Sequence, residues 1–179
     1  MRKINPLVAC AALSFVSACV STPTDPARAV DDPPPAIAIK LPANLEERNR
    51  NWRAQPLTEG EWAYAADAQT SSATFAKVDG PARFRIICDI SSQLVTLERV
   101  GMTAAEGDFM KVRTEILQRD LPTATPDRRV LQTFAYLDRG DPLLDALARS
   151  EERFAIQLSF IQLYLPASPD VARVVSDCR

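Results

Sequence analysis

Apolar and polar residues alternate along much of the chain after residue 60. Phe84, Ile86 and Cys88 fall on one side of such a segment, whereas Arg83 and Arg85 fall on the other. A period of two with one charged side predicts an antiparallel β-strand that buries one face. The alternation predicts strands at 61–66, 83–90, 94–100, 109–117, 130–136, 154–158 and 160–165. Within 109–117, we expect Met110, Val112, Thr114 and Ile116 on the buried face and Lys111, Arg113 and Glu115 opposite.

Two short helices are predicted toward the end of the chain. Asp141 followed by Pro142 is typical of a helix N-terminus, because a capping carboxylate and a proline in the first turn both suit that position. Ser168 and Pro169 repeat this pattern. Each helix has an apolar face at helical spacing. These faces consist of Leu143, Leu144 and Leu147 in the first helix and of Val171, Val174, Val175 and Cys178 in the second.

The order of these elements predicts the fold class. The gaps between strands are short, the chain has only five glycines, and no strand–helix–strand rhythm is present. A parallel doubly wound sheet would need that rhythm. We therefore expect residues 61–179 to form an α+β fold: a small antiparallel β-rich domain, as one sheet or a sandwich, with two short helices.

The first eighteen residues have the pattern of an export signal. Arg2 and Lys3 are followed by an uncharged, mostly apolar stretch from 6 to 16, and then by Ser17 and Ala18. This stretch is too short to span a bilayer, which needs about 20 apolar residues. A basic start, a short apolar run and small residues before a cleavage point are typical of secretory signals. We predict residues 1–18 as a signal peptide.

Val16, Ser17, Ala18 and Cys19 resemble the lipobox of bacterial lipoproteins, which has an aliphatic residue, two small residues and a cysteine. The resemblance implies cleavage before Cys19, a diacylglycerol with fatty chains such as palmitate on its sulfur, and acylation of the new amino terminus. Val20 follows, rather than the aspartate that retains such proteins at the inner membrane of enteric bacteria. The expected location is the periplasmic side of the cell envelope, at the outer membrane rather than the inner one. The alternative is an ordinary secretory signal in which Cys19 is incidental.

Proline is concentrated between the signal and the predicted domain. The prolines of this stretch are Pro23, Pro26, Pro33, Pro34, Pro35, Pro42 and Pro56. Proline fixes φ and removes a hydrogen-bond donor, so we predict residues 19–60 as a lipidated N-terminus and a flexible linker. The linker is either a slack connector or a spacer that reaches on the order of 100 Å when extended. A short helix is compatible with 44–52.

Two of the four cysteines lie on predicted buried faces. Cys88 is in phase with the buried side of its strand, and Cys178 with that of the last helix. Conditions outside the cytoplasmic membrane are oxidising. We predict an intramolecular Cys88–Cys178 disulfide that fastens the last helix to the sheet. The alternatives are two buried thiols and a bond between chains.

The composition restricts the kinds of catalytic, metal and nucleic-acid-binding sites that the chain can form. The chain contains no histidine, which excludes Ser-His-Asp triads, Cys–His pairs and HExxH metal sites. A net charge of -2 disfavours nucleic-acid binding, which normally needs an excess of positive charge. We predict no catalytic residues, no metal and no cofactor. Carboxylates of the kind that glycosidases use, such as Asp67, Asp89, Asp108 and Asp138, more commonly stabilise turns.

Four basic residues lie on the predicted exposed faces of two strands. They are Arg83, Arg85, Lys111 and Arg113. If the two strands are neighbours, these side chains form a basic strip that suits anionic lipid head groups or cell-wall polymers. The alternative is a solvated sheet face neutralised by Glu98 and Glu115.

The chain from residue 141 onward resembles uncharacterised small exported proteins of alphaproteobacteria, through the strings DPLLDALA, RFAI, LYLP and DCR. The resemblance implies no catalytic activity. We expect a non-catalytic binding or scaffolding role, with envelope proteins or a cell-wall polymer as partner. Two alternatives remain open: an envelope enzyme that acts on cell-wall glycan through paired carboxylates, and an accessory lipoprotein of a secretion or assembly complex.

Overall fold

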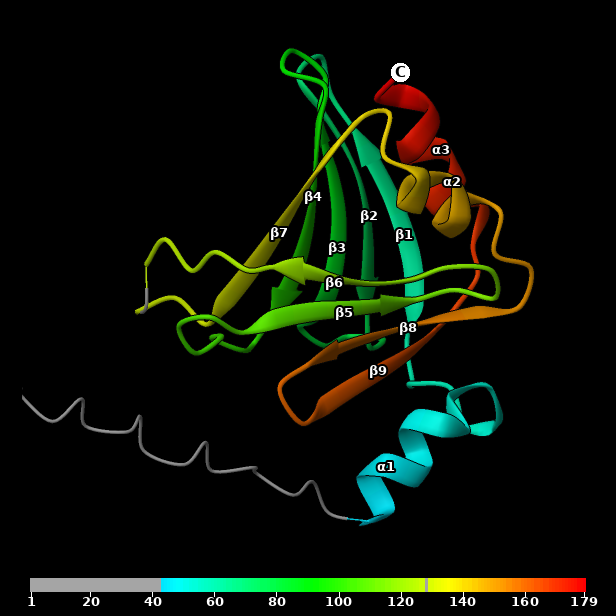
Figure 1. Ribbon diagram of the computed structural model, residues 1–179. Coiled ribbons are helices and arrows are strands. Elements are labelled where there is room, and N and C mark those ends of the chain that lie inside the picture. Colours follow the sequence, from blue (N-terminus) through cyan, green and yellow to red (C-terminus); the bar gives the residue numbers. More distant parts are fainter. Residues whose placement is uncertain (1–42, 128) are drawn as a thin grey trace, which may run out of the picture. The chain divides into compact units, whose positions relative to one another are not determined.

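The computed structural model describes residues 43–127 and 129–179, which contain two antiparallel β-sheets and three α-helices (Figure 1). The predicted signal peptide 1–18, the predicted lipid site Cys19 and the first part of the predicted linker lie outside the described residues. The α+β fold class with an antiparallel β-rich domain is confirmed.

The larger sheet has five strands, in the spatial order β1, β2, β3, β4, β7. Their bounds are β1 Glu61–Ala66, β2 Thr70–Ala76, β3 Ala82–Asp89, β4 Leu94–Val100 and β7 Gln132–Asp138. The first four strands follow one another as a meander, because short turns connect antiparallel neighbours directly. Strand β7 returns from the second sheet and pairs with β4.

The smaller sheet has four strands, in the spatial order β6, β5, β8, β9. Their bounds are β6 Gln118–Pro122, β5 Phe109–Arg113, β8 Arg153–Leu158 and β9 Ile161–Pro166. In Figure 1 these strands run across the direction of β1 to β4. All the ladders in both sheets are antiparallel.

The core lies between the inward faces of the two sheets and two helices, α2 (Pro142–Ala148) and α3 (Pro169–Asp177). Helix α3 packs against β1, β2 and β3, and α2 packs against α3. The alternation seen in the sequence accounts for this burial, because every second residue of a strand points to the same face. The large, fully buried side chains include Phe75, Phe84, Ile86, Leu97, Met110, Phe154 and Ile156.

Both predicted helix caps are confirmed. The Asp141 carboxylate accepts a hydrogen bond from the backbone N–H of Leu143 at 2.8 Å, and the Ser168 hydroxyl accepts one from Asp170 N–H at 3.2 Å. Asp141 also pairs with Arg119 at 2.7 Å, which joins α2 to β6. The predicted apolar faces of both helices are buried.

The predicted disulfide between Cys88 and Cys178 is present, with Cα atoms 5.6 Å apart. Cys88 lies on the inward face of β3, and Cys178 is the residue directly after α3. Both cysteines are buried. The bond therefore ties the end of the chain to the middle of the larger sheet.

The folded body begins before residue 61. Helix α1 (Ala43–Arg50) and a 3₁₀ turn (Trp52–Ala54) occupy part of the stretch predicted as linker. Thr58 N–H donates to the carbonyl of Tyr164 at 2.8 Å, and Tyr164 N–H donates to the Thr58 hydroxyl at 2.9 Å. This stretch therefore lies along β9 in the smaller sheet.

The prediction of one strand over 109–117 is wrong at its end. Strand β5 stops at Arg113, and the chain turns between Thr114 and Leu117. Thr114 N–H donates to the Leu117 carbonyl at 2.8 Å, and the Thr114 hydroxyl accepts from Leu117 N–H at 3.0 Å. Ile116, expected on the buried face, is 75% exposed in this turn.

Candidate functional site

The structure does not bring the four predicted basic residues together. Arg83 and Arg85 lie on β3 in the larger sheet, whereas Lys111 and Arg113 lie on β5 in the smaller one. Arg85 pairs with the buried carboxylate of Glu98 on the adjacent strand at 3.1 Å. Because β3 and β5 are not neighbours, the condition for a basic strip is not met.

The predicted carboxylates mostly hold turns. Asp67 accepts hydrogen bonds from the backbone N–H groups of Gln69 and Thr70, both at 2.8 Å, and these bonds lower the pKa of Asp67. The pKa of Asp89 is lowered first by the Ser91 hydroxyl, at 2.6 Å, and then by Ser92 N–H. Such bonds favour the ionised form of a carboxylate. These carboxylates therefore serve the connections between strands.

Two further properties concern the described part of the chain as a whole. No group of three or more cysteine, aspartate or glutamate side chains there is arranged to hold a metal ion. No helix within 43–127 and 129–179 is long and apolar enough to cross a membrane.

The most distinctive polar surface is the outward face of the smaller sheet, which we call the outer face. Strand register places two rows of side chains on it, each crossing all four strands. One row consists of Asp120, Lys111, Gln157 and Gln162, and the next of Gln118, Arg113, Ala155 and Tyr164. The opposite face of the same strands carries the apolar core residues, as the alternation requires.

Arg113 is the centre of a hydrogen-bond network on the outer face. Its guanidinium donates to the side-chain oxygen of Gln118 at 3.0 Å, to that of Asn49 at 3.2 Å and to that of Gln157 at 3.3 Å. Arg113 is only 6% exposed, and its contact with Asn49 places α1 against it. Burial lowers the pKa of this guanidinium. An arginine predicted to be solvated is therefore covered and bonded to neutral oxygens.

The network continues across β8 and β9. The Gln162 amide donates to the side-chain oxygens of Gln157, at 3.3 Å, and of Asn49. The Tyr164 hydroxyl donates to the Gln162 side-chain oxygen. These bonds fix the orientation of the amide groups before any ligand arrives.

A shallow groove of about 250 Å³ lies on the outer face, formed by β5, β6, β8 and the turns beside them. It is lined by Asp108, Phe109, Lys111, Asp120, Gln157 and Ser159. Phe109 is 56% exposed, and the Lys111 ammonium lies 3.5 Å from the Asp120 carboxylate. The Asp108 carboxylate accepts from the Ser159 hydroxyl at 2.7 Å, which ties the β8–β9 turn to the start of β5.

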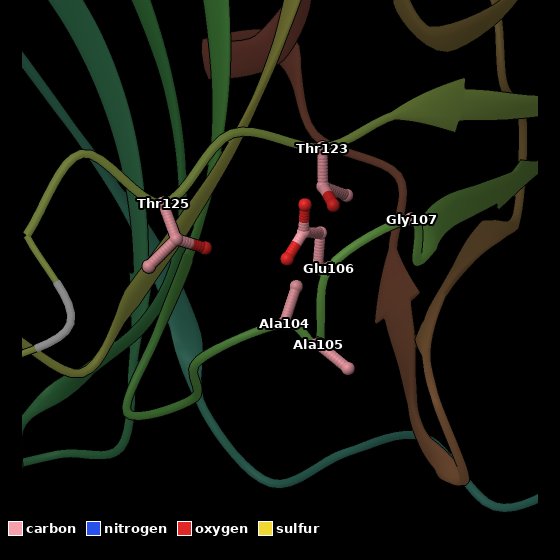
Figure 2. A pocket seen from close by; sticks show the side chains of 6 residues that line it. All are labelled: Ala104, Ala105, Glu106, Gly107, Thr123 and Thr125. Carbon is pink, nitrogen blue, oxygen red and sulfur yellow. The ribbon is translucent and has the colours of Figure 1, made fainter.

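A smaller hollow of about 150 Å³ lies between the loops after β4 and β6. Figure 2 shows the Glu106 carboxylate between the side chains of Thr123 and Thr125, with Ala104 and Ala105 below it and Gly107 to the right. Among the described residues that line it, Glu106 is the only ionisable one. It offers fewer hydrogen-bonding groups than the groove on the outer face.

Comparisons with protein-family models, with curated proteins and with solved structures found no match to this chain. The groove was also not predicted from the sequence. The alternation does place Gln157 and Gln162 opposite the apolar positions of their strands. It does not say that β5, β6 and β8 are neighbours, and this pairing creates the groove.

Proposed function

We propose that this protein is exported, anchored to the cell envelope through lipid on Cys19, and serves there as a non-catalytic binding module. The observation that carries the proposal is the buried Cys88–Cys178 disulfide. Disulfides of this kind form and persist in oxidising compartments, including the bacterial periplasm. The lipobox-like Val16–Cys19 string and the apolar stretch before it agree with the same compartment.

A binding role is supported by the outer face of the smaller sheet. Gln157 lines the groove on this face and is already bonded to Arg113 and Gln162, so little ordering of its side chain is required when a ligand arrives. Two of the carboxylates considered for glycan hydrolysis, Asp67 and Asp89, are occupied in turns. The arrangement therefore favours recognition over catalysis.

The anchor places the domain at the periplasmic side of the membrane. Acyl chains contribute about 0.8 kcal/mol per buried methylene, so two or three chains hold a protein firmly without a spanning helix. Val20 after the lipidated residue favours the outer membrane. The ligand is then a component of the envelope within reach of the linker.

The direct test is a Cys19→Ala variant of the full chain, followed through membrane fractionation. The expected result is that the wild-type chain pellets with membranes and the variant moves to the soluble periplasmic fraction. Cys10→Ala is the matched control, because it removes a cysteine from the signal peptide and leaves the anchor intact. A Cys19→Ala variant that has lost residues 1–18 and still pellets after a high-salt wash would refute lipid anchoring at this residue.

A further inference from the structure

The groove on the outer face combines an apolar platform with a row of hydrogen-bonding groups. Phe109 and its register partner Pro122 are both exposed at one edge of the groove. The adjacent row runs from Asp120 through Lys111 to Gln157. The ring and the polar row lie on the same face of the sheet, so one ligand can contact both.

This combination matches the chemistry of a sugar ring. A hexose in its chair form presents a face of C–H groups, which packs against an aromatic ring. Hydroxyl groups surround its rim, and each of them both donates and accepts hydrogen bonds. Lys111 supplies donors, Asp108 and Asp120 supply acceptors, and the Gln157 amide supplies both.

The polar groups of the groove are held in place before binding. Gln157 accepts from Arg113, at 3.3 Å, and its amide donates to the Ser159 carbonyl at 3.0 Å. The Asp108 carboxylate is fixed by Ser159, and Lys111 by Asp120. Fixed groups lose less conformational entropy on binding than mobile ones do.

The charge and the size of the groove further restrict the class of ligand that it can bind. Two carboxylates and one ammonium line the groove, so anions such as phosphate or anionic lipid head groups are repelled. The volume of about 250 Å³ is below the roughly 300–1,000 Å³ of sites that enclose a drug-sized molecule. A shallow hollow of this size suits one ring of a chain that continues along the surface.

We propose that this groove binds one sugar unit of an uncharged polysaccharide, with Phe109 as the stacking platform and Lys111, Asp120 and Gln157 as the hydrogen-bonding residues. The inference rests on the proposed envelope location, because that location supplies cell-wall and surface glycans as ligands. It names the class of ligand for the binding role proposed above.

The test measures binding by the oxidised, full-length protein in detergent micelles, using isothermal titration. The probes are the tetramers of N-acetylglucosamine and of glucose, which carry no charge. Inorganic phosphate and vesicles of phosphatidylglycerol serve as anionic probes. We expect at least one of the two sugars to bind and both anionic probes to fail.

Variants locate the site. Phe109→Ala is expected to weaken sugar binding by about tenfold, because it removes the apolar platform against which the C–H face of the sugar packs. Gln157→Ala should weaken binding as well. Tyr136→Ala is the matched control, since Tyr136 is an aromatic residue of similar exposure, 48%, on the larger sheet.

Each contrary result has a distinct meaning. Failure of both sugars to bind would overturn the glycan proposal, and so would tighter binding of phosphate or vesicles than of sugar. The assignment of binding to this groove would be wrong if Phe109→Ala and Gln157→Ala left the affinity for sugar unchanged. It would also be wrong if Tyr136→Ala lowered that affinity as much as they do. None of these binding results bears on membrane anchoring, which the Cys19→Ala fractionation tests separately.

Discussion

Arg113 shows how far a single residue can depart from the environment that its sequence pattern predicts. The alternation correctly places it opposite the buried Val112. It does not reveal that α1 covers this position from a distant part of the chain. A pattern of period two assigns a face of the sheet, but the covering of that face is a tertiary property.

Arg113→Ala is therefore expected to destabilise the fold. The substitution removes the Arg113 hydrogen bonds to the side-chain oxygens of Gln118, Gln157 and Asn49, and only the last two keep a donor, the Gln162 amide. Loss of one partner of a buried hydrogen bond costs about 1–3 kcal/mol. Urea unfolding of the purified variant measures the change in the free energy of unfolding.

Lys111→Ala is the control for this prediction, because Lys111 lies on the same strand and pairs with a half-exposed carboxylate. Exposed ion pairs contribute about 0–1 kcal/mol. If both variants unfold at the same urea concentration, Arg113 has no special structural role.

At the scale of elements, the sequence pattern is most reliable where apolar residues alternate without interruption. The predicted strands at 61–66 and 94–100 coincide with β1 and β4, and both helix caps lie at the predicted residues. Strands β2 and β6 were not predicted, because the serines and threonines of β2 and the charged residues of β6 obscure the apolar period. The turn at Thr114–Leu117 depends on local hydrogen bonds that alternation does not encode.

The Cys88–Cys178 disulfide is expected to be the largest single contribution of one bond to the stability of the domain. It joins residues separated by 90 positions, for which the chain-entropy model gives about 4–5 kcal/mol. The Cys88→Ala/Cys178→Ala double variant should show a correspondingly lower free energy of unfolding in urea. Hydrogen exchange of Val174 and Val175 amides should also accelerate, since α3 loses its covalent tie.

Native wild-type protein is the reference for this comparison. Thiol titration before denaturation should detect neither Cys88 nor Cys178. An unchanged urea midpoint in the double variant, or two reactive thiols in the native protein, would contradict the structural role assigned to the bond.

The turns after β1 and β3 predict a dependence of stability on acid. Asp67 and Asp89 have pKa values below the ordinary 3.8, because hydrogen bonds in the fold favour their ionised forms. Their stabilising effect is therefore complete above the ordinary pKa and is lost as the pH falls through the lower folded values. Asn at both positions retains an accepting oxygen but does not titrate.

Thermal unfolding of the Asp67→Asn/Asp89→Asn variant across the acid range tests whether the stabilisation by these carboxylates is lost as the pH falls. The melting temperature of the variant should fall less steeply below pH 4 than that of the wild type. Parallel curves for the two proteins would show that these carboxylates do not contribute to acid unfolding.

For the whole molecule, the fold class followed from local patterns, whereas the site followed from the way strands pair. The groove needs β5 beside β6 and β8, and the hydrogen-bond network beside it needs Asn49 of α1 next to Arg113. These neighbours are remote in sequence, and their pairing depends on which apolar faces complete one common core. The proposed function joins this site to a lipid anchor that is a prediction from the sequence.

The proposed envelope location depends most on processing and lipidation at Cys19, which intact-mass spectrometry of the protein purified from its native membrane measures directly. The predicted mass is that of the chain from Cys19 to Arg179 plus diacylglycerol and an N-terminal acyl group, less the two hydrogens lost in the disulfide. A chain that retains residues 1–18, or one that begins at Cys19 without acyl mass, would contradict the account.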